Sequence, residues 1–227
     1  MKAVFLDFDG VIVDSIRECY EVSLLTYWGF RPPPGPEDQY RGLFRAARGL
    51  VGPAREYLFL HEAVRACLGD PDEDLAQAFA KARGRFSPGE VERFEAIFFA
   101  CRAFVSRDRQ RWLALHSLTD FGRSLVGREL PHHYIITTKD EDSVRLLLSH
   151  FEIAIDTILG RDDFTRSGDK AAMIGRIMDE RGYSEARFVD DNQTHLGSVS
   201  DPRIRLVFAD WGYGSLLGQD INRQGAA

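Results

Sequence analysis

The sequence lacks any apolar run long enough to cross a membrane, since a spanning helix needs roughly 20 consecutive apolar residues. No signal peptide is predicted either, because residues 1–6 run directly into carboxylates instead of ending at a small-residue cleavage site. Cysteine is scarce: Cys19, Cys67 and Cys101 are odd in number and widely spaced, so reduced thiols are expected. We therefore expect a cytoplasmic protein with no membrane partner.

Positive charge is also in short supply. The chain has 29 lysines and arginines against 35 aspartates and glutamates, a formal net charge of −6. A general nucleic-acid binder presents a basic face, so nucleic acid is not an expected partner. An acidic protein can still bind a phosphate ester where local groups or a metal ion supply the positive charge.

The 227 residues divide into segments of two kinds. Between about residues 37 and 130 no segment has the pattern of a strand, and helical periodicity recurs at 43–50, 57–68, 75–86, 91–105 and 112–126. Outside this block, short apolar runs predict strands at 2–8, 134–136, 154–159, 187–189 and 204–208. This alternation predicts an α/β protein with a Rossmann-like parallel-sheet core, residues 1–15 and 131–227, and an inserted all-helical cap domain, residues 16–130.

Polar residues stand where these strands end, and in an open parallel sheet ligands bind beyond the carboxyl ends of the strands. The residues are Asp7 and Asp9 after the first strand, Thr137, Thr138 and Lys139 after the second, Lys170 at the start of the helix that follows the third, and Asp190 and Asp191 after the fourth. The sequence therefore predicts one site at this edge of the sheet.

The acids indicate a divalent cation. Asp7 interrupts an apolar run, where an unpaired carboxylate is costly, and strand alternation puts Asp9 on the same side of the chain. Capping of a turn or a helix is the structural alternative, but two adjacent acids, Asp190 and Asp191, exceed what one cap needs. Mg²⁺ is the expected ion, because it takes few protein carboxylates and leaves room for waters and a phosphate.

The lysines and the threonine suggest a phosphate site. Lys170 stands in the first turn of its predicted helix, where the helix dipole disfavours a cation. A solvated lysine is the alternative, but a buried role beside a carboxylate and a phosphate explains the position better. Lys139 is expected to be exposed because the acidic run 140–142 follows it. Thr137 offers a hydroxyl to a phosphoryl oxygen, although threonine also forms strands readily.

Together these residues resemble the four motifs of the haloacid dehalogenase (HAD) superfamily in order and spacing. Asp7-Phe8-Asp9-Gly10-Val11 followed by Val13-Asp14-Ser15 is similar to the first motif, Thr137 to the second, Lys170 to the third and Asp190-Asp191 to the fourth. The resemblance covers residues 1–15 and 131 to about 211. It implies phosphate chemistry, because the dehalogenase branch lacks an acid at the position of Asp9.

The resemblance also implies roles for single residues. Asp7 attacks phosphorus and forms an aspartyl-phosphate, and Asp9 acts as general acid and then as general base. The implied phosphate-binding set is Thr137, Thr138, Lys170 and Gly10, and the implied Mg²⁺ ligands are Asp7, Asp9, Asp191 and Asp190. The chain departs from the family pattern at His195, which occupies the usual place of a second acid.

Two residue sets stand out in the predicted cap. Arginines recur at helical spacing at Arg41, Arg45 and Arg48, with Arg55 soon after. They form either a solvated face or a site for a second anionic group of the substrate. The phenylalanines, namely Phe94, Phe98, Phe99 and Phe104, are expected in the core between cap helices.

The expected function is hydrolysis of a small phosphorylated metabolite. A capped phosphomutase that interconverts sugar phosphates would use the same Asp7 and Asp9, and it is an alternative. A second alternative is a non-catalytic phosphorylatable or ligand-binding module of the receiver-domain kind, although such a module has no need of the long insertion. The sequence leaves the substrate and the oligomeric state open.

Overall fold

The computed structural model describes residues 1–216, and these form two compact units. The sheet unit comprises Met1–Ser15 and Ser117–Gly212, and the helical unit comprises Ile16–His116 and residues 213–216. The sequence predicts that the sheet unit resumes at residue 131, whereas in the structure it resumes at Ser117. The reason is a short antiparallel pair between β2 (Val13–Asp14) and β3 (Ser117–Leu118), which ties this segment to the sheet unit.

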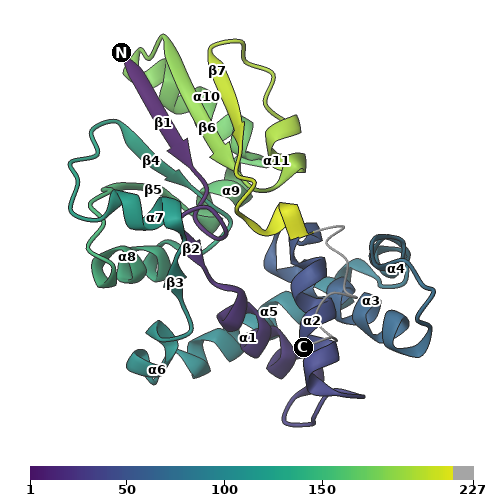
Figure 1. The fold of residues 1–227 in the computed structure, drawn as a ribbon. Coiled ribbons are helices and arrows are strands. Elements are labelled where there is room, and N and C mark those ends of the chain that lie inside the picture. The colour runs from purple at the N-terminus through teal and green to yellow at the C-terminus, as the bar shows by residue number, and fades with distance from the viewer. Residues whose placement is uncertain (217–227) are drawn as a thin grey trace. The chain divides into compact units, whose positions relative to one another are not determined.

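Five parallel strands form the sheet in the order β5-β4-β1-β6-β7 (Figure 1). They are β1 (Lys2–Leu6), β4 (His133–Ile136), β5 (Thr157–Leu159), β6 (Glu185–Asp190) and β7 (Ile204–Phe208). The central strand β1 pairs with β4 on one side and β6 on the other, with Leu6 opposite both Ile135 and Val189. The predicted α/β class is confirmed, and the carboxyl ends of three neighbouring strands lie together.

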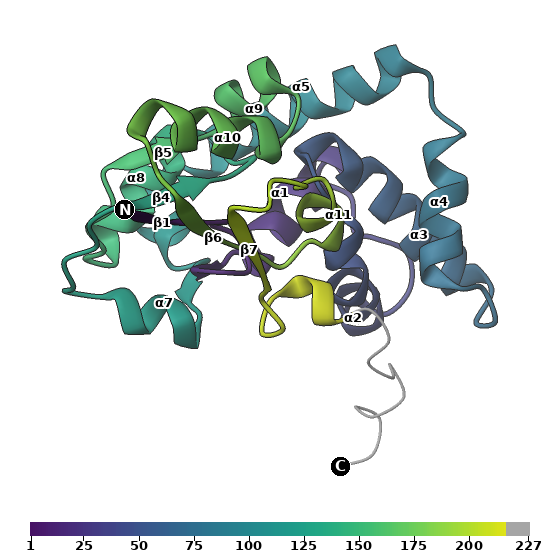
Figure 2. The same ribbon diagram turned by 90° about the horizontal axis from the view of Figure 1, so that it is seen from above.

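Helices lie on both sides of the strands (Figure 2). Helices α9 (Arg161–Ser167) and α10 (Lys170–Arg181) lie on one side, and α7 (Asp120–Leu125) lies on the other. The remaining helices of the unit, α8 (Glu141–His150) and α11 (Gln193–Gly197), connect β4 to β5 and β6 to β7.

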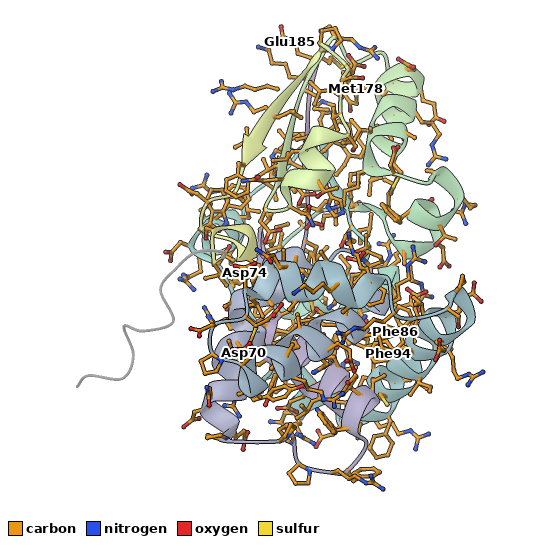
Figure 3. All side chains as sticks on the ribbon, turned by 90° about the vertical axis from the view of Figure 1, so that its right-hand side faces the viewer. Asp70, Asp74, Phe86, Phe94, Met178 and Glu185 are labelled. Carbon is orange, nitrogen blue, oxygen red and sulfur yellow. The ribbon has the colours of Figure 1, made fainter. Side chains whose placement is uncertain are left out.

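The core on the α10 side is apolar and buried. Met173, Ile174 and Met178 of α10 pack with Phe5 of β1 and Phe188 of β6. Met178 is labelled in Figure 3. This packing fixes α10, and therefore Lys170 at its first position, against the centre of the sheet.

Side-chain caps determine where the helices beside the site begin. The Asp169 carboxylate accepts a hydrogen bond from the amide of Ala172 at 2.7 Å, so that Lys170 becomes the first residue of α10. The Asn192 side chain accepts from the amide of Thr194 at 2.9 Å and starts α11. Such caps satisfy amides that the helix itself leaves unpaired.

The helical unit consists of helices that pack around their own core. Its elements are α1 (Ile16–Trp28), α2 (Glu37–Ala47), η1 (Arg48–Leu50), η2 (Ala54–Glu56), α3 (Tyr57–Gly69), α4 (Leu75–Arg83), α5 (Pro88–Val105), α6 (Arg109–Leu113) and η3 (Tyr213–Leu216), where η denotes a 3₁₀ turn. Phe94 is buried in this core and Phe86 packs against it, both labelled in Figure 3. Within residues 1–216, every helix is too short or too polar to span a bilayer.

Candidate active site

Lys170 joins two carboxylates at the end of the central strands. Its Nζ lies 2.8 Å from Oδ1 of Asp7, which directly follows β1, and 2.7 Å from Oδ2 of Asp190, the last residue of β6. Lys170 is 1% exposed and Asp190 is fully buried. Strand pairing explains the closeness of the two acids, because the amide of Asp7 donates to the carbonyl of Val189 at 2.9 Å.

His195 makes a further contact with the same carboxylate. Its Nδ1 lies 3.2 Å from Oδ2 of Asp190, the oxygen that also accepts from Lys170. The other oxygen of Asp190 accepts from the amide of Asn192 at 2.8 Å. Asp190 is thus held by a lysine, an imidazole and a backbone amide, and the histidine that departs from the family pattern belongs to this network.

The charges of these groups influence one another. Burial raises the pKa of the Asp7 carboxyl even though Lys170 opposes that effect. Burial also disfavours ionisation of Asp190, but the charge of Lys170 and the contact with the His195 ring hold its pKa below the usual value. Burial would lower the pKa of Lys170, yet Asp190 and Asp7 outweigh it and raise that pKa to about 12. Lys170 is therefore a permanent cation at neutral pH.

The cluster of acids fits a divalent cation. Asp7, Asp190 and Asp191 are all buried, and each offers a carboxylate oxygen within 4.8 Å of the others. The ammonium of Lys170 offsets only one of these three negative charges, and buried like charges repel strongly. Oxygen ligands at this spacing suit Mg²⁺, which keeps several waters beside one or two carboxylates.

A second group of contacts surrounds Asp9. The Ser15 hydroxyl donates to Oδ1 of Asp9, and the Nζ of Lys139 lies 3.5 Å from the same oxygen. Ser15 is fully buried and Lys139 is 3% exposed. The prediction that Lys139 is exposed is therefore wrong, and the contact between Ser15 and Asp9 was not predicted from the sequence. Ser15 and Lys139 therefore contact the same carboxylate oxygen of Asp9.

The remaining predicted phosphate ligands lie beside Asp9 and Lys139. Thr137 is 1% exposed, and its hydroxyl oxygen accepts from the amide of Lys139 at 3.2 Å. Thr138 is half-buried. Gly10 has a φ of 85°, a conformation that favours glycine, and its amide donates to the carbonyl of Val13 at 2.8 Å. Gly10 therefore shapes the turn between Asp9 and β2.

The arginines of the helical unit do not share one open face. Arg48 is buried, with its guanidinium 5.5 Å from the ring centre of Tyr57 and 4.6 Å from that of Tyr213. Arg41 is exposed and pairs with Glu37 at 2.5 Å on the same helix. These contacts fit structural roles for Arg41 and Arg48. Arg45 is exposed, but it does not form one basic stripe with them.

The predicted phenylalanine core is correct in part. Phe94 and Phe98 are buried and Phe99 packs against them, whereas Phe104 is 54% exposed. The guanidinium of Arg107 lies 5.7 Å from the ring centre of Phe104. Phe104 therefore belongs to the surface of α5, and the prediction that placed it in the core is wrong.

Comparison with solved structures finds this fold in haloacid dehalogenase-like hydrolases. A haloacid dehalogenase-like hydrolase from Streptococcus pneumoniae matches with a TM-score of 0.61 and 20% identity, over 93% of this chain and 86% of that chain. A predicted phosphoglycolate phosphatase from Haemophilus somnus matches with a TM-score of 0.61 and 16% identity, over 94% and 87%. A predicted phosphatase from Clostridium acetobutylicum matches with a TM-score of 0.58 and 16% identity, over 94% and 86%.

Sequence comparison adds no relative. No protein-family model matches the chain, and no curated protein matches it. The likeness to these solved structures therefore rests on the fold. The chain has the fold of the haloacid dehalogenase-like hydrolases.

Proposed function

We propose that this chain is a phosphatase that hydrolyses a small phosphate monoester through a covalent aspartyl-phosphate on Asp7, with Mg²⁺ as its cofactor. The contact between Lys170 and both Asp7 and Asp190 carries the proposal. A buried ammonium at this place holds a nucleophilic carboxylate and balances the charge of an incoming phosphoryl group. The similar structures include a predicted phosphoglycolate phosphatase and a predicted phosphatase, which supports the same class of reaction.

The proposed reaction proceeds in two displacements. An oxygen of Asp7 forms a bond to phosphorus while the bond from phosphorus to the ester oxygen breaks, and Asp9 donates its proton to that oxygen. Asp9 then accepts a proton from a water whose oxygen attacks phosphorus, and the bond between Asp7 and phosphorus breaks. The products are an alcohol and inorganic phosphate, and Asp9 regains its proton.

The other residues bind and orient. In this proposal Lys170 and the hydroxyl of Thr137 bind phosphoryl oxygens, and Ser15 with Lys139, which both contact Asp9, orients this acid/base. Asp7, Asp191 and the backbone carbonyl of Asp9 would hold Mg²⁺, with Asp190 beside them. The ion would neutralise negative charge on the transferring group.

Turnover of a defined panel tests this proposal. The wild-type protein and Asp7→Asn are incubated with Mg²⁺ and p-nitrophenyl phosphate, phosphoglycolate or a hexose phosphate, and free phosphate is measured. We expect the wild type to release phosphate and Asp7→Asn to lose about three orders of magnitude or more in kcat. Asp156→Asn, which changes an exposed carboxylate of the same unit, is the matched control.

Other outcomes identify the alternatives. An isomeric ester in place of free phosphate indicates a phosphomutase, and a stable phosphoprotein without turnover indicates a receiver-like module. Full activity in Asp7→Asn would remove Asp7 as the nucleophile. The free energy of unfolding of Asp7→Asn is expected to change little or to rise. Asparagine relieves repulsion among three buried acids, and Lys170 keeps its contact with Asp190.

A further inference from the structure

The turn that follows β7 packs directly against Asp191. A methyl group added at Gly212 would lie 2.4 Å from Cβ of Asp191, 2.7 Å from its Oδ2 and 2.9 Å from its Cγ. Side-chain carbons do not approach one another so closely, so a larger residue at position 212 forces either the turn or the Asp191 carboxylate to move.

Backbone conformation does not explain the glycine. The φ angle of Gly212 lies outside the left-handed range, which Gly10 and other glycines of this chain occupy. A φ angle outside that range does not by itself require glycine. Position 212 therefore requires glycine because there is no space for a side chain beside the Asp191 carboxylate.

One hydrogen bond closes the turn, and two others tie it to its surroundings. The amide of Gly212 donates to the carbonyl of Ala209 at 3.0 Å, and the amide of Ala209 donates to the carbonyl of Asp190 at 3.0 Å. The indole Nε1 of Trp211 donates to the carbonyl of Val11 at 3.1 Å. These bonds connect the turn both to β6 and to the loop that carries Asp9.

Packing of the indole reinforces the connection. The ring centre of Trp211 lies 5.4 Å from that of Phe121 on α7. The Val11 carbonyl also accepts from the Thr119 hydroxyl at 2.7 Å, so this oxygen keeps a partner when the indole bond is removed. Trp211 is itself 43% exposed, and burial of its ring alone does not account for its place beside this loop.

We propose that Gly212 and Trp211 are positioning residues for the metal-binding carboxylate of Asp191. This inference rests on the proposed function, in which Asp191 binds Mg²⁺. Gly212 lets the turn contact the Asp191 side chain, which limits the directions in which its carboxylate can point. Trp211 anchors the turn to the Val11 carbonyl. This bond keeps the distance between Asp191 and the loop that carries Asp9 constant. Groups that orient a metal ligand typically influence metal affinity by about 10- to 100-fold.

Direct Mg²⁺ binding tests the inference without reference to turnover. The dissociation constant is measured by isothermal titration calorimetry for the wild type, Gly212→Ala, Trp211→Phe and Gly197→Ala, and the melting temperature is measured without metal. Gly197→Ala is the matched control, because a methyl group there has no heavy atom within 4 Å apart from its chain neighbours and the backbone of its own helix. We expect Gly212→Ala to raise the dissociation constant by about ten-fold or more. Trp211→Phe should raise it by about five-fold, which corresponds to one net hydrogen bond.

The result separates this inference from the proposed function. A wild type that neither binds Mg²⁺ nor releases phosphate would overturn the proposed function. A wild type that does both, with a Gly212→Ala variant whose dissociation constant equals that of Gly197→Ala, would overturn the inference alone. If Gly212→Ala does not fold, Trp211→Phe decides: its ring keeps the packing against Phe121, and an unchanged dissociation constant would equally overturn the inference.

Discussion

The ammonium nitrogen of Lys139 lies 3.5 Å from Oδ1 of Asp9, and both side chains are largely buried. The backbone of Lys139 is fixed on both sides, since its amide donates to Thr137 and its carbonyl accepts from the amide of Arg161 at 2.9 Å. The site thus contains two buried lysines with different neighbours. Lys170 contacts the proposed nucleophile, and Lys139 contacts the proposed acid/base.

Lys139→Met should lower kcat for phosphate release. The methionine keeps the length of the side chain and removes its charge. Asp9 then keeps its contact with Ser15 and loses its contact with the ammonium group. A positioned acid/base contributes about 10²- to 10⁴-fold to a rate, and partial loss of its orientation should lower kcat by roughly 10- to 100-fold. Steady-state kinetics of the wild type, Lys139→Met and Lys139→Arg provide the measurement, and the arginine variant should recover part of the loss.

Lys2→Met is the matched control for this prediction. Lys2 also pairs with a carboxylate, Glu185 at 2.8 Å, but the pair is exposed at the opposite end of β1. An unchanged kcat in Lys139→Met, or a rise in KM alone, would show that Lys139 does not act through Asp9.

The sequence predicts the sheet well, and it puts the acids at the strand ends, because both follow from local pattern. Apolar runs mark the strands, and β7 has the predicted bounds at Ile204–Phe208. The sequence predicts that strand β5 begins at residue 154, whereas it begins at Thr157. Buried Ile153 and Ile155 alternate with exposed neighbours as in a strand, so the apolar pattern starts before strand pairing does. Parallel pairing then brings the strand ends together, and the positions of Asp7, Lys170 and Asp190 follow from that topology.

The local sequence pattern does not predict the burial of Lys139, and the reason is physical. The acidic run after it suggests a solvated segment, but the Asp140 carboxylate accepts from the amide of Ser143 at 2.9 Å and caps α8. The acids therefore start a helix, and the lysine points inward. The roles of Ser15 and Gly212 likewise depend on contacts with side chains that only the folded chain brings near, and no spacing in the sequence signals them.

Mg²⁺ should stabilise the folded protein through the three buried acids. A ligand present at 100 times its dissociation constant adds about 2.7 kcal/mol to the free energy of unfolding. For a chain of this size that corresponds to a rise in melting temperature of roughly 5–10 °C. We expect this rise when Mg²⁺ is added to EDTA-treated protein, as measured by differential scanning calorimetry.

Asp191→Asn should lose most of that rise, whereas Asp156→Asn, which changes an exposed carboxylate, should keep it. Without metal, Asp191→Asn should melt at the same temperature as the wild type or higher, because one of three mutually repelling charges is removed. Equal Mg²⁺ responses in the two variants would place the ion elsewhere.

A buried ion pair connects α1 and α5 in the helical unit, and removing one partner should destabilise that unit strongly. Nε of Arg102 lies 2.7 Å from Oε1 of Glu18, and its Nη2 lies 3.2 Å from Oε2. Arg102→Met removes the cation that pairs with the buried Glu18 carboxylate, which should lower the free energy of unfolding by about 3–5 kcal/mol. Urea denaturation monitored by circular dichroism provides the measurement.

The matched control is Arg83→Met. Arg83 also pairs with a glutamate, Glu56 at 2.6 Å, and also lies over an aromatic ring, that of Phe79, but its side chain is 52% exposed. The expected loss there is below about 1 kcal/mol. The double variant Glu18→Leu with Arg102→Met should recover much of the stability, and equal losses in Arg102→Met and Arg83→Met would contradict the argument from burial.

His61 should make the helical unit less stable in mild acid. The side chain is fully buried, and burial lowers its pKa from 6.5 to about 3. Trp28 Nε1, which can only donate, lies 3.1 Å from the Tyr40 hydroxyl, and that hydroxyl lies 2.7 Å from Nδ1 of His61. The arrangement lets the Tyr40 hydroxyl accept from Trp28 and donate to His61, which requires the neutral imidazole.

The sign of the pH dependence follows from proton uptake. Between pH 6.5 and 3 the unfolded chain binds a proton at His61 and the folded chain does not, so the stability contributed by the neutral imidazole is complete above pH 6.5 and falls as the pH falls. The slope from this residue approaches about 1.4 kcal/mol per pH unit below pH 6. His61→Gln keeps an acceptor for Tyr40 and cannot titrate, so urea unfolding between pH 7 and 5 should give a shallower slope than in the wild type. Parallel curves for the two proteins would mean that His61 takes up its proton in the folded state, and the assignment of the neutral imidazole would then fail.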